Sequence, residues 1–158
     1  MKIMTASSEE TGVLARALSS LIHPGMTILL EGPLGSGKTT FTQHLGRALG
    51  IRRAIKSPTY TIVKEYPLEN HQQLIHIDAY RLEKGGADSI DLDSYLTNDS
   101  LVLIEWAEFL GNYLPETYLQ IVFRPQENLH HREITITAHG PQKARYEAII
   151  DQLEECQS

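Results

Sequence analysis

The sequence predicts an α/β domain of three layers, in which helices flank a mixed, partly parallel β-sheet. Strand-like and helix-like segments alternate along the first part of the chain, which is typical of parallel strands joined by helices. Residues 101–104 form an uninterrupted apolar run, as expected of a strand buried on both faces. A hairpin pattern in the middle of the chain adds antiparallel pairing. With 158 residues and no linker-like stretch, we expect a single domain over residues 1–158.

The predicted elements begin with a helix and a strand. Ser7 is placed to cap a helix with Glu10 as its capping-box partner, and apolar residues recur at helical spacing up to residue 22. A proline–glycine pair ends this helix. Residues 26–31 are an apolar run of strand length, and residues 40–49 again show helical spacing.

Between that strand and helix, residues 32–39 read Gly-Pro-Leu-Gly-Ser-Gly-Lys-Thr and match the phosphate-binding pattern G-x-x-x-x-G-K-[ST] at every fixed position. Glycines let backbone N–H groups approach an anion, and the helix N-terminus adds further donors. Lys38 is expected to reach the β- and γ-phosphates, and Thr39 to ligate Mg²⁺. The sequence therefore predicts a nucleoside triphosphate site in a phosphate-loop NTPase fold. The expected nucleotide-binding residues of this loop are Gly32, Gly35, Ser36, Gly37, Lys38, Thr39 and Thr40.

The rest of the chain is expected to complete the sheet. Strands are predicted at residues 59–66, 73–78, 101–104, 118–123 and 132–138, with a hairpin loop at 67–71. We expect the strand at 101–104 to lie beside the strand at 26–31, in the centre of the sheet. A short helix is predicted at 89–96 after a glycine-rich loop, and Pro141 is expected to open a last helix.

A triphosphate site also needs a carboxylate near the metal, usually where a buried strand ends beside the phosphate loop. Glu105 directly follows the apolar run at 101–104. Asp78 follows a similar run, which His76 interrupts. Each acid is either a metal-site carboxylate or an ordinary surface residue beyond a strand end.

The roles of Trp106 and of residues 57–59 each have two interpretations. Trp106, the only tryptophan, is either a half-buried core aromatic or a contact for nucleotide or a partner. Ser57, Pro58 and Thr59 form either a simple turn or a switch loop whose hydroxyl senses the γ-phosphate.

The composition narrows the class of protein. A net charge of −6 provides no overall basic field for nucleic acid. The single cysteine, Cys156, has no partner for an internal disulfide, which suits a reducing cytoplasm. No segment reaches the apolar length of a membrane span, and the N-terminus lacks a secretory core. We therefore expect a cytoplasmic protein that does not bind membranes.

Four segments together resemble the bacterial TsaE (YjeE) family, small phosphate-loop ATPases of tRNA threonylcarbamoyladenosine synthesis. They are residues 34–40, 56–61, 76–81 and 104–108, which read LGSGKTT, KSPTYT, HIDAYR and IEWAE. Their order and spacing agree with the family over nearly the whole chain. Ser36 stands where the family often has alanine, which removes no functional group.

The resemblance implies ATP and Mg²⁺ as cofactors, with Lys38 and Thr39 at the phosphates and the metal. It implies that Asp78 and Glu105 are acidic active-site residues near the metal, and that Trp106 lies beside the site. The segment 57–59 is expected to behave as a switch. The implied partners are TsaD, which transfers the threonylcarbamoyl group, and its paralogue TsaB. ATP binding would drive assembly with the TsaB–TsaD dimer and hydrolysis would permit turnover, with tRNA reached indirectly through that complex.

Other functional classes have less support. A small-molecule kinase shares the loop and the size, and Arg81 beside the glycines at 85–86 could form a lid, but no arginine cluster accompanies it. A GTPase would need an Asn-Lys-x-Asp motif, which the sequence lacks. A scaffold without hydrolysis would be expected to lack Lys38 or both acids. Slow intrinsic turnover is expected, because no arginine finger or catalytic glutamine is apparent.

Overall fold

The computed structural model describes residues 1–56 and 62–157. Seven strands form one sheet in the order β1-β7-β6-β2-β5-β4-β3. The strands are β1 (Lys2–Thr5), β2 (Thr27–Glu31), β3 (Val63–Pro67), β4 (Gln73–Asp78), β5 (Ser100–Glu105), β6 (Tyr118–Pro125) and β7 (Arg132–His139). The four central strands, β6, β2, β5 and β4, run parallel, whereas β3, β7 and β1 pair antiparallel. The predicted mixed sheet is therefore confirmed, with β5 beside β2 at its centre.

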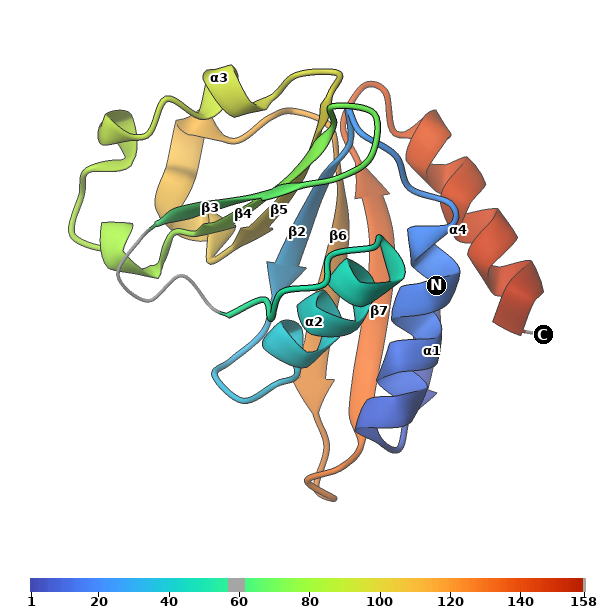
Figure 1. Cartoon of the computed structure of the whole chain (residues 1–158). Coiled ribbons are helices and arrows are strands. Elements are labelled where there is room, and N and C mark those ends of the chain that lie inside the picture. The colour runs from blue at the N-terminus through green and yellow to red at the C-terminus, as the bar shows by residue number, and fades with distance from the viewer. Residues whose placement is uncertain (57–61, 158) are drawn as a thin grey trace.

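Helices cover the two faces unequally (Figure 1). Three α-helices, α1 (Ser8–Ser19), α2 (Lys38–Ala48) and α4 (Ala144–Gln157), pack on one face. The other face carries only short elements. These are the 3-10 helices η1 (Tyr80–Leu82), η2 (Ala87–Ser89) and η3 (Ala107–Tyr113) and the single helical turn α3 (Leu92–Tyr95). The three-layer architecture holds, and its second helical layer is thin.

Alternating side chains of the strands supply a separate apolar core on each face. Ile28 and Leu30 of β2 pack toward the three α-helices, whereas Leu29 between them packs toward the short helices. On the first face Phe41 of α2 meets Phe123 of β6 edge-on, with ring centroids 5.5 Å apart. These contacts fix α2, and therefore the loop that precedes it, over the centre of the sheet.

The predicted cap of the first helix is confirmed in part. Ser7 caps α1, and its Oγ accepts a hydrogen bond from the Glu10 N–H at 3.2 Å. The Glu10 carboxylate reaches back to the N–H of Ala6 at 2.7 Å, one residue before the position that a capping box would use.

Several predicted boundaries are wrong for local reasons. The helix predicted at 89–96 is only one turn, because Ile90 is extended and separates η2 from α3. The last helix begins at Ala144 rather than Pro141, since a turn from Gly140 to Lys143 comes first. Neither β1 nor η3 is predicted from the sequence. β1 is an edge strand with one buried residue in four, so it carries no clear apolar pattern. The predicted strand start at 59–61 lies outside the described residues.

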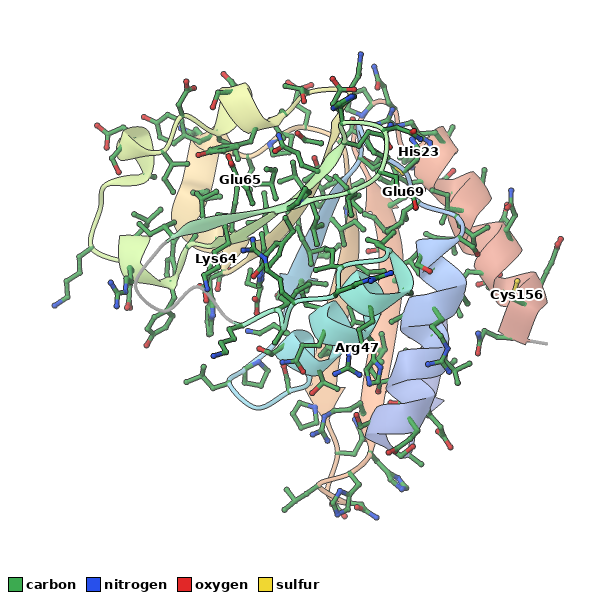
Figure 2. All side chains as sticks on the ribbon, in the orientation of Figure 1. His23, Arg47, Lys64, Glu65, Glu69 and Cys156 are labelled. Carbon is green, nitrogen blue, oxygen red and sulfur yellow. The ribbon has the colours of Figure 1, made fainter. Side chains whose placement is uncertain are left out.

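The sequence also raised expectations about the single cysteine and about membrane-spanning segments. Cys156 is an exposed free thiol near the end of α4 (Figure 2). Within residues 1–56 and 62–157, no helix combines the length and apolar character that crossing a bilayer requires.

Candidate nucleotide site

The loop between β2 and α2 has a backbone that only glycine allows at two positions. Gly32 has a φ of 152°, and a Cβ there would lie 2.7 Å from the carbonyl oxygen of Phe123. Gly37 has a φ of 107° and forms the N-cap of α2 in the left-handed region. These conformations turn the chain sharply from the end of β2 into the helix.

The turn presents a row of backbone donors at the start of α2. The first bond of the helical ladder runs from the Phe41 N–H to the Gly37 oxygen at 2.9 Å. The N–H groups of Lys38, Thr39 and Thr40 precede it and have no acceptor within the helix. Together with the positive end of the helix dipole, these groups favour a negative charge at this end of α2.

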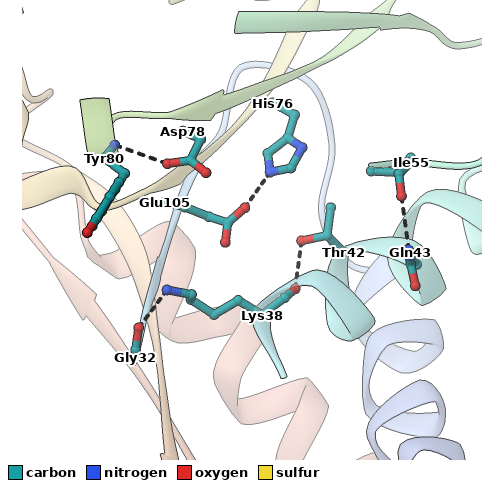
Figure 3. Close-up of polar contacts among 9 residues, drawn as sticks. All are labelled: Gly32, Lys38, Thr42, Gln43, Ile55, His76, Asp78, Tyr80 and Glu105. Atoms are coloured by element: carbon teal, nitrogen blue, oxygen red, sulfur yellow. Dashed lines mark hydrogen bonds and ion pairs between the residues drawn. The ribbon is translucent and has the colours of Figure 1, made fainter. Parts of the chain in front are cut away.

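Lys38 is directed inward although it carries a charge. Its side chain is buried, and its Nζ donates to the Gly32 carbonyl oxygen at 2.5 Å (Figure 3). The same Nζ lies 4.2 Å from the centre of the Trp106 ring. The ring is half-buried and stacks on Phe109. Trp106 is thus a half-buried aromatic that packs against the core of its face and also lines the cavity described below, and its contact with nucleotide stays a prediction.

The two predicted carboxylates come together through strand register. β4 and β5 are parallel, and Asp78 is the direct partner of Glu105 at their C-terminal ends. Paired residues of adjacent strands share a face, so both side chains lie on the face that carries α2. Asp78 Oδ1 accepts a hydrogen bond from the Tyr80 N–H at 3.0 Å. Glu105 Oε2 lies 2.7 Å from Nε2 of His76, also on β4 (Figure 3).

A cavity of about 200 Å³ joins the loop to these acids. Its lining residues are Leu34, Gly35, Ser36, Gly37, Lys38, Thr39, Thr40, Asp78, Glu105, Trp106 and Arg132. The structure therefore brings the sequence-predicted site residues to one place. Gly32 contributes through its carbonyl contact with Lys38. The switch candidates Ser57, Pro58 and Thr59 lie outside the described residues.

The residues present fit a phosphate group and a divalent cation. The hydroxyl of Ser36 is buried without a hydrogen-bond partner among the described residues, so a donor is available inside the loop. Carboxylate and hydroxyl oxygens are the ligand types that Mg²⁺ prefers, and Asp78, Glu105 and Thr39 supply them. No group of three or more His, Cys, Asp or Glu side chains in the described part of the chain could hold a metal alone. A cation here would complete its shell with water and phosphate oxygens.

Two site residues were not assigned a role from the sequence. Arg132, at the start of β7, lines the cavity and donates to the carbonyls of Gly35, Leu129 and His131. No local pattern marks it, because only the β6–β7 hairpin brings it to the loop. His76 had a visible signal, since it is a polar residue within an otherwise apolar strand.

A second, smaller cavity of about 120 Å³ adjoins the first. The two cavities share Gly37, Thr40 and Arg132, and the smaller one extends to Ser7, Ser8 and Thr11 at the start of α1 and to His130. The site thus continues from the acids, across the phosphate loop, to the first helix.

Comparisons with known proteins identify the family of this chain. Residues 5–134 match the family described as "Threonylcarbamoyl adenosine biosynthesis protein TsaE". A Bacillus subtilis (strain 168) protein named tRNA threonylcarbamoyladenosine biosynthesis protein TsaE is 40% identical over 153 residues, covering 97% of this chain and 93% of its own length. A protein of the same name from Streptomyces coelicolor is 43% identical over 112 residues, covering 68% of this chain and 74% of its own.

The fold has a solved relative as well. A crystal structure of Bacillus subtilis YdiB superposes with a TM-score of 0.82 at 36% identity, covering 100% of this chain and 96% of that one. The sequence match spans most of the chain, and the structural match includes all of it. On these grounds this chain belongs to the TsaE family and has its phosphate-loop NTPase fold.

Proposed function

We propose that this protein is the ATP-binding and slowly ATP-hydrolysing subunit of the bacterial tRNA threonylcarbamoyladenosine synthesis machinery. The observation that carries the proposal is the cavity in which Lys38 and the phosphate loop face Asp78 and Glu105. Membership of the TsaE family supports the link to this tRNA modification. In this proposal the chain does not itself transfer the threonylcarbamoyl group.

The phosphate loop and the two acids of the cavity each have a chemical role in the proposal. The backbone N–H groups of residues 37–40 and the ammonium of Lys38 offset the negative charge of the phosphates. Thr39, Asp78 and Glu105 would hold Mg²⁺, which would supply further positive charge to offset the phosphates. The adjoining cavity toward Ser8 and Thr11 would take the ribose and base of ATP.

Slow hydrolysis in isolation follows from the groups that are already engaged. Stabilising the transition state of phosphoryl transfer requires positive charge beyond the lysine, often from an arginine. Arg132 lies at the cavity, but its guanidinium donates to three backbone carbonyls. A partner protein would supply the missing charge or order the segment 57–59.

The proposed partners are homologues of TsaB and TsaD, with ATP binding driving assembly with their dimer and hydrolysis allowing turnover. Contact with tRNA would be indirect, through that complex, in the cytoplasm. The protein's net charge of −6 suits this division of labour, since it offers no general attraction for RNA.

The test is reconstitution of the purified chain with its own TsaB and TsaD homologues. Complex formation is measured by size-exclusion chromatography with ATP, with ADP and without nucleotide, and phosphate release is measured with and without the pair. ATP-dependent assembly and faster phosphate release support the proposal. An unchanged rate and no assembly contradict it. Phosphorylation of an added small metabolite by the chain alone would favour the small-molecule kinase instead.

A further inference from the structure

A buried histidine lies on β4, beside the proposed metal site. His76 lies on β4 and is fully buried. Its neighbours Ile75 and Ile77 pack in the core of the opposite face, so the His76 side chain points toward α2. Burying an imidazole costs free energy unless it is hydrogen-bonded. A buried histidine in an apolar strand therefore needs a hydrogen-bond partner.

That partner is Glu105, also buried. His76 pairs in register with Leu103, so Glu105 is its diagonal neighbour, two residues further along β5 and on the same face. The distance from His76 Nε2 to Glu105 Oε2 is 2.7 Å, which is typical of a hydrogen bond to a charged carboxylate. With the hydrogen on Nε2, the imidazole donates and the carboxylate accepts.

The surroundings of the other ring nitrogen, Nδ1, show which polar contact the His76 side chain makes. Nδ1 is buried and has no hydrogen-bond partner among the described residues. Among the described residues, the polar contact of the His76 side chain is therefore the one between Nε2 and Glu105. Figure 3 shows the second carboxylate oxygen of Glu105 directed away from His76, toward the side where Lys38 lies.

We propose that His76 is a positioning residue that holds one oxygen of Glu105 so that the other faces the Mg²⁺ of bound nucleotide. The inference rests on the proposed function, in which Glu105 serves the metal. A buried carboxylate without this donor would lose its fixed direction and its compensating hydrogen bond. Hydrogen-bonding partners of metal ligands commonly change metal affinity by about 10- to 100-fold when removed.

The test compares variants that keep or remove the Nε2 donor. In His76→Gln, the amide nitrogen stands the same number of bonds from Cβ as Nε2 and can still donate to Glu105. His76→Phe keeps a buried ring without a donor, and His76→Asn has a donor too short to reach. His139→Phe is the matched control, because His139 is also a hydrogen-bonded strand histidine but contacts Thr137 and Tyr118 instead.

The measured quantity is the Mg²⁺ concentration that gives half-maximal ATP binding, obtained by calorimetry on the folded full-length variants. We expect His76→Phe and His76→Asn to require about 10- to 100-fold more Mg²⁺, and His76→Gln to stay within about threefold of the wild type. ATP binding in EDTA should be alike in all of them. If His76→Phe does not fold, His76→Asn and His76→Gln decide the question.

Two results overturn the inference. One is an unchanged Mg²⁺ requirement in the donor-free variants. The other is a His76→Gln variant as impaired as the donor-free ones, since the shape of the imidazole would then matter rather than its donor. Failure of the wild-type protein to bind ATP at any Mg²⁺ concentration refutes the proposed function itself, so the two failures are distinguishable.

Discussion

The ammonium of Lys38 sits over the face of Trp106, 4.2 Å from the ring centre, while it donates to the carbonyl of Gly32. Trp106 reaches this position because its own backbone is left-handed, with a φ of 56°, directly after Glu105. Such a conformation is costly for a non-glycine residue and persists where the surrounding structure holds it. Because Trp106 is the only tryptophan of the protein, its fluorescence should report on the proposed phosphate-binding lysine.

This contact leads to a prediction for Lys38→Met, which keeps the chain length and removes the charge. We expect ATP affinity to fall about 10- to 100-fold, since a hydrogen bond to a charged group contributes roughly 1.5–3 kcal/mol. Tryptophan fluorescence should change when ATP binds to the wild type, because Lys38 would turn from the ring toward the phosphates. Lys64→Met, on the edge strand β3, is the control. Equal affinity in the Lys38 and Lys64 variants would contradict the assignment of Lys38.

A second prediction concerns the paired acids. Glu105→Gln and Asp78→Asn should each raise the Mg²⁺ needed for ATP binding by about tenfold or more, because a carboxylate ligand becomes a neutral amide. In EDTA the same variants should bind ATP as well as the wild type or better, since one negative charge near the phosphates is gone. Calorimetry with and without Mg²⁺ measures both effects.

The control for the acids is Glu108→Gln, which neutralises an exposed carboxylate three residues after Glu105. It should leave the Mg²⁺ requirement unchanged. The metal assignment of Asp78 or Glu105 fails if its amide variant behaves like this control.

A third prediction separates two costs of replacing glycine. Gly140 and Gly50 both have positive φ, 101° and 91°, but a Cβ on Gly140 would overlap the Glu116 carbonyl oxygen, whereas Gly50 has open space. Gly50→Ala should cost about 1–2 kcal/mol of unfolding free energy from backbone conformation alone. Gly140→Ala should cost roughly 3 kcal/mol or more, because overlap with fixed backbone adds to that cost. Urea unfolding of both variants measures the difference, and equal losses would show that the close approach to Glu116 is unimportant.

A fourth prediction concerns pH and the contact between α1 and α2. Burial, followed by repulsion from Arg47 and Arg16, lowers the pKa of His44 below its ordinary value of 6.5, and Glu9 partly offsets this. The unfolded chain then binds a proton at His44 more readily than the folded protein does. Above about pH 6.5, His44 does not lower the unfolding free energy. As the pH falls through and below that value, the protein loses stability through His44.

His44→Gln should therefore reduce the loss of unfolding free energy on going from about pH 8 to pH 5. Glu9→Gln should increase that loss, because it removes the one charge that raises the pKa of His44. Urea unfolding curves at the two pH values measure the difference. A His44→Gln variant with the full pH dependence of the wild type would exclude a role for His44.

The sequence alone determined the phosphate loop, its flanking strand and helix, and the strand that ends at Glu105. These features are local. The loop needs glycine at fixed positions, and a strand buried on both faces is an unbroken apolar run, so each is visible within a few residues. The four segments that resemble the TsaE family are equally local, and their order along the chain is enough to identify the family.

Tertiary structure decided the features that depend on register between distant strands. The pairing of Asp78 with Glu105 and the contact between His76 and Glu105 arise because β4 and β5 align in parallel across more than twenty residues of chain. Arg132 reaches the phosphate loop only through the β6–β7 hairpin. Side-chain direction in a sheet reverses with a shift of one residue, so local sequence cannot specify which of these groups meet.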